Sequence, residues 1–233
     1  MFIDFHTHFL HGIDDGASDL RTGVKMLEAS HRQGTECVVA TPHFHLEDTT
    51  ISDACSMRDS AMAELIAYTQ KRNIHIPDIV CGFEVDFNNA LKDQKELKNL
   101  CIQGTDYMLI EMPYTDWNEQ LYECLYNLTL AGVKPVIAHV DRYYRHVGEA
   151  VYRLLELDVS LQFNCDVMNT ISGRNFVKQL MDTGRACVIG TDMHNMISRP
   201  CNISKSHKKS MQKLPMYTHD LFYANARKLL FEN

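Results

Sequence analysis

Seven short apolar segments, each followed by a helical pattern, constrain the fold of this 233-residue chain more than any other feature. The expected strands occupy residues 1–5, 36–40, 78–82, 107–111, 135–138, 160–164 and 186–190. The expected helices occupy residues 20–33, 52–72, 91–100, 121–131, 147–157, 176–183, 204–213 and 218–230. Because each helix must return the chain to the end where the previous strand began, the strands are predicted to be parallel.

A closed or nearly closed (β/α) barrel of seven units is the architecture that this pattern favours. The length and an apolar content of 45% suit one large domain, and no linker-like stretch divides residues 1–233. An open, doubly wound sheet is the alternative. It is weakened because no glycine-rich phosphate loop of a nucleotide-binding type follows any expected strand.

Composition limits the compartment and the partners. No run approaches the ~18 apolar residues of a membrane span, and Asp4 and His6 stand where a signal peptide would be basic and then apolar. We therefore expect a soluble, cytoplasmic protein without membrane insertion. The eight cysteines are widely spread without a C-x-x-C pair, which predicts buried, reduced thiols. A net charge of −7, with only a short basic cluster at residues 205–209, argues against nucleic-acid binding.

Side chains that can bind metals gather at the carboxyl ends of the expected strands. His6 and His8 lie two residues apart, so on a strand both imidazoles point to the same face. Asp15 follows in the next loop, and six further candidates end or follow later strands: His43, Glu84, Glu111, His139, Asp192 and His194. Barrel enzymes carry their active sites at this end of the strands. The pattern therefore predicts a metal cluster at one mouth of the barrel.

Nine candidate ligands are too many for one ion with about four to six positions, so two or three ions are indicated. Three divalent ions against four carboxylates would leave a net charge of about +2. Such a site would attract a dianion although the whole chain is acidic, and Arg142 and Arg199 would add to this attraction. A phosphate ester is the substrate that this charge balance favours.

A series of motifs in the same order as in a known family covers the chain nearly from end to end. The motifs are HTHFLHGIDDGA, ATPHF, GFE, LIEMP, IAHVDRY, LQFN and GTDMHNMISRP. Together they resemble the polymerase-and-histidinol-phosphatase (PHP) superfamily. The DDGA segment and the H-N-x-x-x-R-P ending are similar to its bacterial branch of protein-tyrosine phosphatases associated with capsule and exopolysaccharide synthesis. The resemblance implies an α/β fold, a distorted (β/α)7 TIM-like barrel known as the PHP fold.

The resemblance also implies a site of three divalent metal ions. His6, His8, Glu84 and Asp192 would hold the first ion, and Glu84 would bridge to a second ion held with Glu111 and His139. Asp15, His43 and His194 would hold the third. We expect manganese, with iron, cobalt or zinc as alternatives. Arg142 and Arg199 match the phosphate-binding arginines of the family. Asp4 is expected either to orient His6 or to be structural, and Asp14 and His11 are expected to be ordinary loop residues.

The implied activity is hydrolysis of phosphotyrosine by a metal-activated hydroxide, with an autophosphorylated bacterial tyrosine kinase as the protein partner. Independently of the resemblance, no cysteine is followed by an arginine at the spacing of the thiolate loop in cysteine-dependent phosphatases. A histidinol phosphatase or another small-molecule phosphoesterase would use the same metals, and a PHP-type exonuclease is disfavoured by the acidic charge. From another class, a phosphotyrosine-binding module without turnover remains an alternative.

Overall fold

The computed structural model describes residues 1–115 and 117–232, and it contains all seven expected strands. They are β1 (Phe2–Thr7), β2 (Thr35–Ala40), β4 (Asp78–Cys81), β6 (Tyr107–Glu111), β7 (Lys134–Ile137), β8 (Ser160–Asn164) and β9 (Cys187–Gly190). Two further strands, β3 (His43–Phe44) and β5 (Glu84–Asp86), resume after breaks of two residues behind β2 and β4. The sequence pattern missed them because two or three residues are too few to show a period.

The strands form a distorted barrel, as predicted. All pairings are parallel, in a three-stranded sheet of order β1-β2-β4 and a six-stranded sheet of order β3-β5-β6-β7-β8-β9. The two sheets are joined where a bridge pairs Thr7 at the end of β1 with Met193 beyond β9, and the His8 amide donates to the Met193 carbonyl at 2.9 Å. The sheets are connected a second time on the other side of β1. There the chain continues from β2 into β3 and from β4 into β5. The open-sheet alternative is therefore wrong.

Five helices follow the expected periodicity to within a few residues, apart from an earlier start of α5. They are α1 (Leu20–Arg32), α2 (Ile51–Arg72), α3 (Glu119–Leu130), α5 (Ile171–Met181) and α6 (Ile203–Lys213). The last predicted helix is divided into α7 (Pro215–His219), the π-helical η5 (Asp220–Ala224) and α8 (Asn225–Phe231). Asp19 caps α1 by accepting from the Thr22 amide at 2.9 Å, as the choice of Ser18 or Asp19 in the sequence suggests.

Two predicted helices have a different form. Residues 91–100 contain only the short 3₁₀ helices η1 (Leu91–Asp93) and η2 (Leu97–Leu100). The helix expected at residues 147–157 is the 3₁₀ segment η3 (Gly148–Glu156), and α4 (Val140–Val147) precedes it, while η4 (Cys165–Asn169) follows β8. The sequence pattern missed α4 because it begins directly behind the strand-end residue His139, without a loop that would mark its start.

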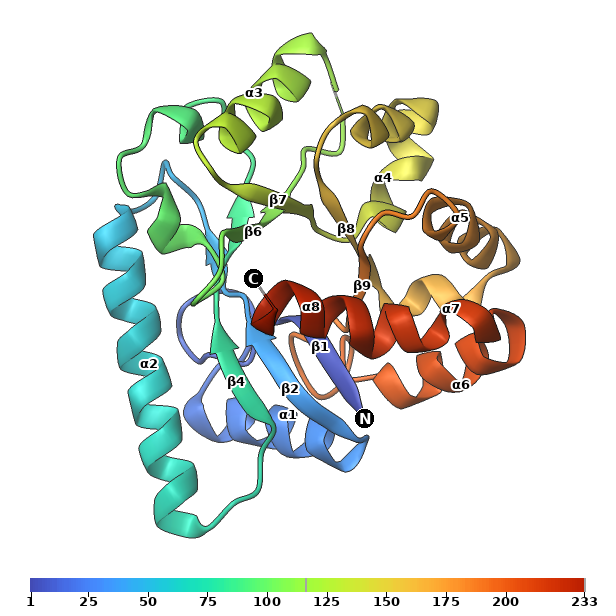
Figure 1. The fold of residues 1–233 in the computed structure, drawn as a ribbon. Coiled ribbons are helices and arrows are strands. Elements are labelled where there is room, and N and C mark those ends of the chain that lie inside the picture. The colour runs from blue at the N-terminus through green and yellow to red at the C-terminus, as the bar shows by residue number, and fades with distance from the viewer. Residues whose placement is uncertain (116, 233) are drawn as a thin grey trace.

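The apolar core lies partly inside the barrel and partly beneath its helices (Figure 1). The smaller cluster contains residues of β1, β2, β6, β7 and β9 together with Ala226, Leu229 and Leu230 of α8. Residues of five different strands can meet only inside the ring, so α8 packs over one end of the barrel. The carboxyl ends of the strands lie at the opposite end of the barrel, and this end stays free for polar side chains.

Two predictions from composition can be compared with this structure. Within residues 1–115 and 117–232, no helix combines the length and the apolar character that a membrane span requires. All eight cysteines are reduced thiols, and six of them are buried. Burial raises the pKa of the Cys37, Cys187 and Cys201 thiols to about 12, so these groups stay protonated and unreactive at neutral pH.

Candidate metal centre

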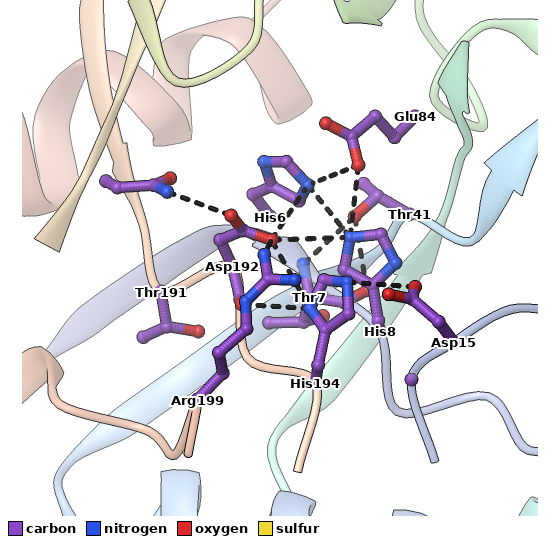
Figure 2. Close-up of polar contacts among 12 residues, drawn as sticks. His6, Thr7, His8, Asp15, Thr41, Glu84, Thr191, Asp192, His194 and Arg199 are labelled. Carbon is purple, nitrogen blue, oxygen red and sulfur yellow. Dashed lines mark hydrogen bonds and ion pairs between the residues drawn. The ribbon is translucent and has the colours of Figure 1, made fainter. Parts of the chain in front are cut away.

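The innermost part of the polar cluster joins residues from β1, from β5 and from the loop after β9 (Figure 2). Nε2 of His6 lies 2.9 Å from Nε2 of His8, so both imidazoles point at one place as their spacing predicts. Oε2 of Glu84 lies 3.0 Å from the His6 nitrogen and 3.2 Å from the His8 nitrogen. Oδ1 of Asp192 lies 3.7 and 3.6 Å from the same two atoms. Four donor atoms thus surround a common centre.

Glu84 connects this centre to a second group of donors. Its Oε1 lies 2.8 Å from Nε2 of His139, and its Oε2 lies 3.3 Å from Nδ1 of His43. Glu111, the last residue of β6, lies with Oε1 3.4 Å from His139 Nε2 and with Oε2 3.8 Å from His43 Nδ1. A carboxylate with donors on both oxygens is suited to bridge two cations.

A third group lies toward solvent. Oδ1 of Asp15 is 3.2 Å from Nε2 of His194 and 3.5 Å from Nε2 of His43, and the Asp15 side chain is 69% exposed. The structure thus brings all nine predicted side chains together. Three sets place one donor atom of each residue within 4.8 Å of the others: His6, His8 and Asp192; His43, Glu84 and Glu111; and His8, Asp15, His43 and His194. His139 belongs to none of these sets but contacts both glutamates.

Three side chains that the sequence interpretation did not assign to the site hold the donors in place. Asp14, which we expected to be an ordinary loop residue, is buried and accepts from Nδ1 of His8 at 2.7 Å and from the His43 amide at 3.1 Å. On β8, Oε1 of Gln162 lies 3.0 Å from Nδ1 of His6, and Nδ2 of Asn164 donates to Asp192 at 2.9 Å. Such partners fix which imidazole nitrogen faces a metal. The alternating polar residues in the strand LQFN were the available signal.

Asp4 was expected either to orient His6 or to be structural, and the structure supports the structural role. Its carboxylate accepts from the amide and the hydroxyl of Thr191 at 2.8 and 2.7 Å, which ties β1 to the segment after β9. It contacts only the backbone amide of His6, at 3.4 Å. Gly190 at the end of β9 allows this strand to lie close to β1, because a Cβ there would lie 2.5 Å from Cβ of His6. His11, the other loop residue, lies with Nε2 3.2 Å from Glu64 on α2 and outside the cluster.

Two candidate ligands have unusual backbone conformations. His139 has φ of 28° and Asp192 has φ of 53°, so both non-glycine residues lie in the left-handed region. Each is the second residue after a barrel strand, behind β7 and β9 respectively. Strained residues of this kind persist where the surrounding contacts hold them, and they gather at functional sites.

The carboxylates make the cluster a strong attractor of positive charge. Burial opposes protonation of His8, but Asp14 and Glu84 raise its pKa to about 10. Burial likewise opposes protonation of His139, but Glu111 and Glu84 raise its pKa to about 9. By contrast, burial and the nearby His8 lower the pKa of His194 to about 4. Both findings suit a cation site, because the carboxylates attract positive charge and a neutral imidazole can donate a lone pair.

The residues fit divalent metal ions. Nδ1 of His43 and Nε2 of His194 are buried and face carboxylate oxygens at 3.3 and 3.2 Å, yet within the described residues neither makes a hydrogen bond of acceptable geometry. A bound cation would supply the missing partner for each of them. The donors are imidazole nitrogens and carboxylate oxygens without a thiolate, a set that accepts manganese, iron, cobalt or zinc.

Arg142 and Arg199 meet at Asp192, at the edge of the donor cluster. Nη2 of Arg199 lies 2.5 Å from Oδ1 of Asp192, and Nη2 of Arg142 contacts Oδ2. The Arg199 side chain is 36% exposed and the Arg142 side chain is 31% exposed, so part of each guanidinium faces the cavity. The two predicted arginines can therefore bind a phosphoryl group through their remaining donors.

A side chain in the loop before Arg199 fixes the position of this arginine. Oδ1 of Asn195 accepts from the amides of Ile197, Ser198 and Arg199 at 2.9, 2.7 and 3.2 Å. The carbonyl of Arg199 in turn accepts from the amide of His194 at 3.1 Å. The loop is thus closed onto the strand-end histidine, which explains the asparagine in the H-N-x-x-x-R-P motif.

We expect Asn195→Ala to lower kcat/KM on aryl phosphates by about 10- to 100-fold, because the loop that carries Arg199 loses its acceptor. Asn195→Asp keeps an oxygen at the same place and should retain most activity. Steady-state kinetics of the two variants, beside the exposed control Asn89→Ala, measure this difference. Equal losses in the alanine and aspartate variants would contradict the assigned role.

A parallel (β/α) barrel with a buried histidine and carboxylate cluster at the carboxyl ends of its strands belongs to the class of metal-dependent barrel hydrolases. Within this class the chain is a member of the family described as "Capsular polysaccharide synthesis, CpsB/CapC", whose pattern matches residues 2–231.

Known relatives and solved structures agree with this family. The chain is 29% identical to tyrosine-protein phosphatase YwqE of Bacillus subtilis over 203 residues, which is 84% of this chain and 79% of that protein. It is 24% identical to tyrosine-protein phosphatase CpsB of Streptococcus agalactiae over 98% of both chains. A chain from the crystal structures of YwqE from Bacillus subtilis and CpsB from Streptococcus pneumoniae, described as unique metal-dependent tyrosine phosphatases, matches with a TM-score of 0.83. That match has 25% identity and covers 98% of this chain and 94% of the other.

Proposed function

We propose that the protein is a metal-dependent protein-tyrosine phosphatase, active as a single domain. The observation that carries the proposal is a cavity of about 750 Å³ in which six of the nine donors, both arginines and an apolar wall meet. The donors and the arginines suit a phosphoryl group, and the wall suits an aromatic leaving group. The names of the relatives YwqE and CpsB support the same activity.

Three divalent ions, with manganese expected first, would be held by the nine donors. His6, His8, Glu84 and Asp192 would hold one; Glu84, Glu111 and His139 a second; and Asp15, His43 and His194 a third. Bound ions supply an activated water and stabilise negative charge on the phosphoryl oxygens. Asp14 and Gln162 keep the imidazoles of His8 and His6 in the orientation that presents Nε2 to the centre.

The two arginines bind and orient the substrate. Each holds one oxygen of Asp192 and keeps other N–H groups free for the phosphoryl oxygens, so the phosphate is fixed beside the donors. Because charge on these oxygens changes during the reaction, guanidinium donors held in advance stabilise the transition state. The tyrosine oxygen is a relatively good leaving group, so the mechanism requires no covalent intermediate.

The apolar wall of the cavity accounts for an aromatic substrate. It consists of Ile13, Ala54, Met57 and Phe83, which come from the β1 loop, from α2 and from the break before β5. Phe83 is buried, whereas Met57 is 49% exposed and presents a flexible apolar side chain to the cavity. A phenyl ring linked to a phosphate at the arginines can rest against this wall.

We expect Met57→Ala to lower kcat/KM for phosphotyrosine and p-nitrophenyl phosphate about fivefold, because about 1 kcal/mol of apolar contact with the ring is lost. Turnover of an alkyl phosphate such as phosphoserine should be unchanged, since it has no ring. Met211→Ala on α6 is a matched control, because Met211 is 51% exposed and lies on another helix. An equal loss on both substrates would show that Met57 does not contact the ring.

The physiological substrate that we infer is the phosphorylated tail of a bacterial tyrosine kinase that controls capsule or exopolysaccharide synthesis. The CpsB/CapC family description supports the capsule context. Eight reduced cysteines suit the cytoplasm, where such a kinase tail would be found.

Side-by-side rates on a phosphotyrosyl peptide and on histidinol phosphate, with metal analysis of the same preparation, test the proposal. We expect preferred turnover of the peptide, loss of activity with a chelator and recovery with manganese. Preferred turnover of histidinol phosphate would instead support a small-molecule phosphatase. Binding of the peptide without hydrolysis in the metal-loaded protein would support a phosphotyrosine-binding module.

A further inference from the structure

A second cavity, of about 440 Å³, adjoins the candidate centre and has no part in the function described so far. Arg142 lines both cavities, so its side chain forms the boundary between them. The second cavity lies between α4, the segment after β8 and the beginning of α5, on the side of the barrel opposite α2 (Figure 1). A chain that extends from a phosphorylated side chain held at Arg142 can enter it directly.

The walls of this cavity combine a guanidinium and an imidazole with aromatic rings. Arg145 and His146 on α4 are exposed, and within the part of the chain that the structure describes neither makes an ion pair. Tyr144 stacks on Phe176 with ring centroids 4.9 Å apart, and Tyr114 meets His146 edge-on at 5.4 Å. These packed rings form firm walls beside Arg145 and His146.

The carboxylates in the same cavity are already engaged. Asp141 is only partly exposed and accepts from the Asn164 amide at 2.9 Å. Oδ1 of Asp166 accepts from Asn169 and Asn202, both at 2.8 Å. The amino end of α5 also lines the cavity through Thr170, Ser172 and Gly173, and adds partial positive charge. Of the charged side chains that line the cavity, Arg145 is thus the one that makes no hydrogen bond or ion pair with the described residues, since Arg142 pairs with Asp192.

We propose that this cavity is a subsite for the substrate chain next to the phosphotyrosine, and that it selects acidic side chains. The proposal rests on the proposed tyrosine phosphatase function. Arg145 pairs with a carboxylate of the substrate, and the rings of Tyr114 and Tyr144 pack against the peptide backbone. An aryl phosphate without flanking residues does not reach the subsite.

Two phosphotyrosyl peptides that differ only in having Glu or Gln on both sides of the phosphotyrosine provide the test, with p-nitrophenyl phosphate as the small substrate. The unaltered protein should show a 5- to 20-fold higher kcat/KM on the Glu peptide, mostly through KM and weakened by salt. Arg145→Glu should abolish or reverse this preference and change p-nitrophenyl phosphate turnover less than twofold.

Lys71→Glu is the matched control, because it makes the same charge change at an exposed position in the last turn of α2, outside both cavities. This variant should keep the preference for the Glu peptide. Equal turnover of the two peptides by the unaltered protein, or an equal effect of Arg145→Glu and Lys71→Glu, would overturn the subsite alone. Failure to hydrolyse either peptide and p-nitrophenyl phosphate would overturn the proposed function as well.

Discussion

Replacing Glu84 with Gln should lower kcat/KM on p-nitrophenyl phosphate by at least about a thousandfold, equivalent to about 4 kcal/mol of lost transition-state stabilisation. The oxygens of Glu84 lie within 3.3 Å of nitrogen atoms of four other candidate ligands, His6, His8, His43 and His139. Glutamine keeps the shape but removes the charge and one acceptor. A bridge between two ions would then be lost.

Metal analysis and thermal unfolding separate this effect from general damage. The variant should keep a cooperative unfolding transition but bind fewer equivalents of manganese than the unaltered protein. Glu119→Gln is the control, because Glu119 is 83% exposed and pairs with Arg153 at the surface, away from the donor cluster. Full activity or an unchanged metal content in the Glu84 variant would contradict the assignment of the bridging ligand.

Arg142→Lys and Arg199→Lys should each lower kcat by about 100- to 1,000-fold, the range seen when one preorganised donor to a developing charge is removed. Lysine retains the charge but not the planar fork that can hold Asp192 and a phosphoryl oxygen together. The metal content should stay unchanged, because neither arginine is among the nine donors.

Inhibition by inorganic phosphate provides a second measurement on the arginine variants. Its inhibition constant should rise along with the loss of kcat/KM, because phosphate would use the same guanidinium donors. Arg21→Lys, at an exposed position on α1, should behave like the unaltered protein. Normal phosphate inhibition in both variants would show that the arginines do not touch the phosphoryl group.

Much of the fold and the position of the cluster could be predicted from local pattern. Strands such as residues 107–111 are short, nearly continuous apolar runs, whereas helices such as residues 20–33 repeat apolar residues on the face that they must bury. Parallel strands place their carboxyl ends at one mouth, so the convergence of His6, Glu111 and Asp192 followed from order alone. The missed elements β3, β5 and α4 were too short or lacked a preceding loop.

The functions of single side chains within the site were harder to predict. Asp14 and Asp15 are neighbours of the same type, yet one is buried against His8 and the other is 69% exposed. Gln162 and Asn164 contact donors on other strands, far away in the chain. No local pattern contains these contacts, because they depend on the direction in which each side chain leaves its strand.

The sequence by itself determined that seven parallel strands would carry histidines and carboxylates to one end, because hydrophobic period and chain direction are local properties. Only the tertiary structure decided that Glu84 lies at the centre of the cluster and that Asp192 receives both arginines. These arrangements arise from packing between distant segments, where a change of a few ångströms determines which atoms meet.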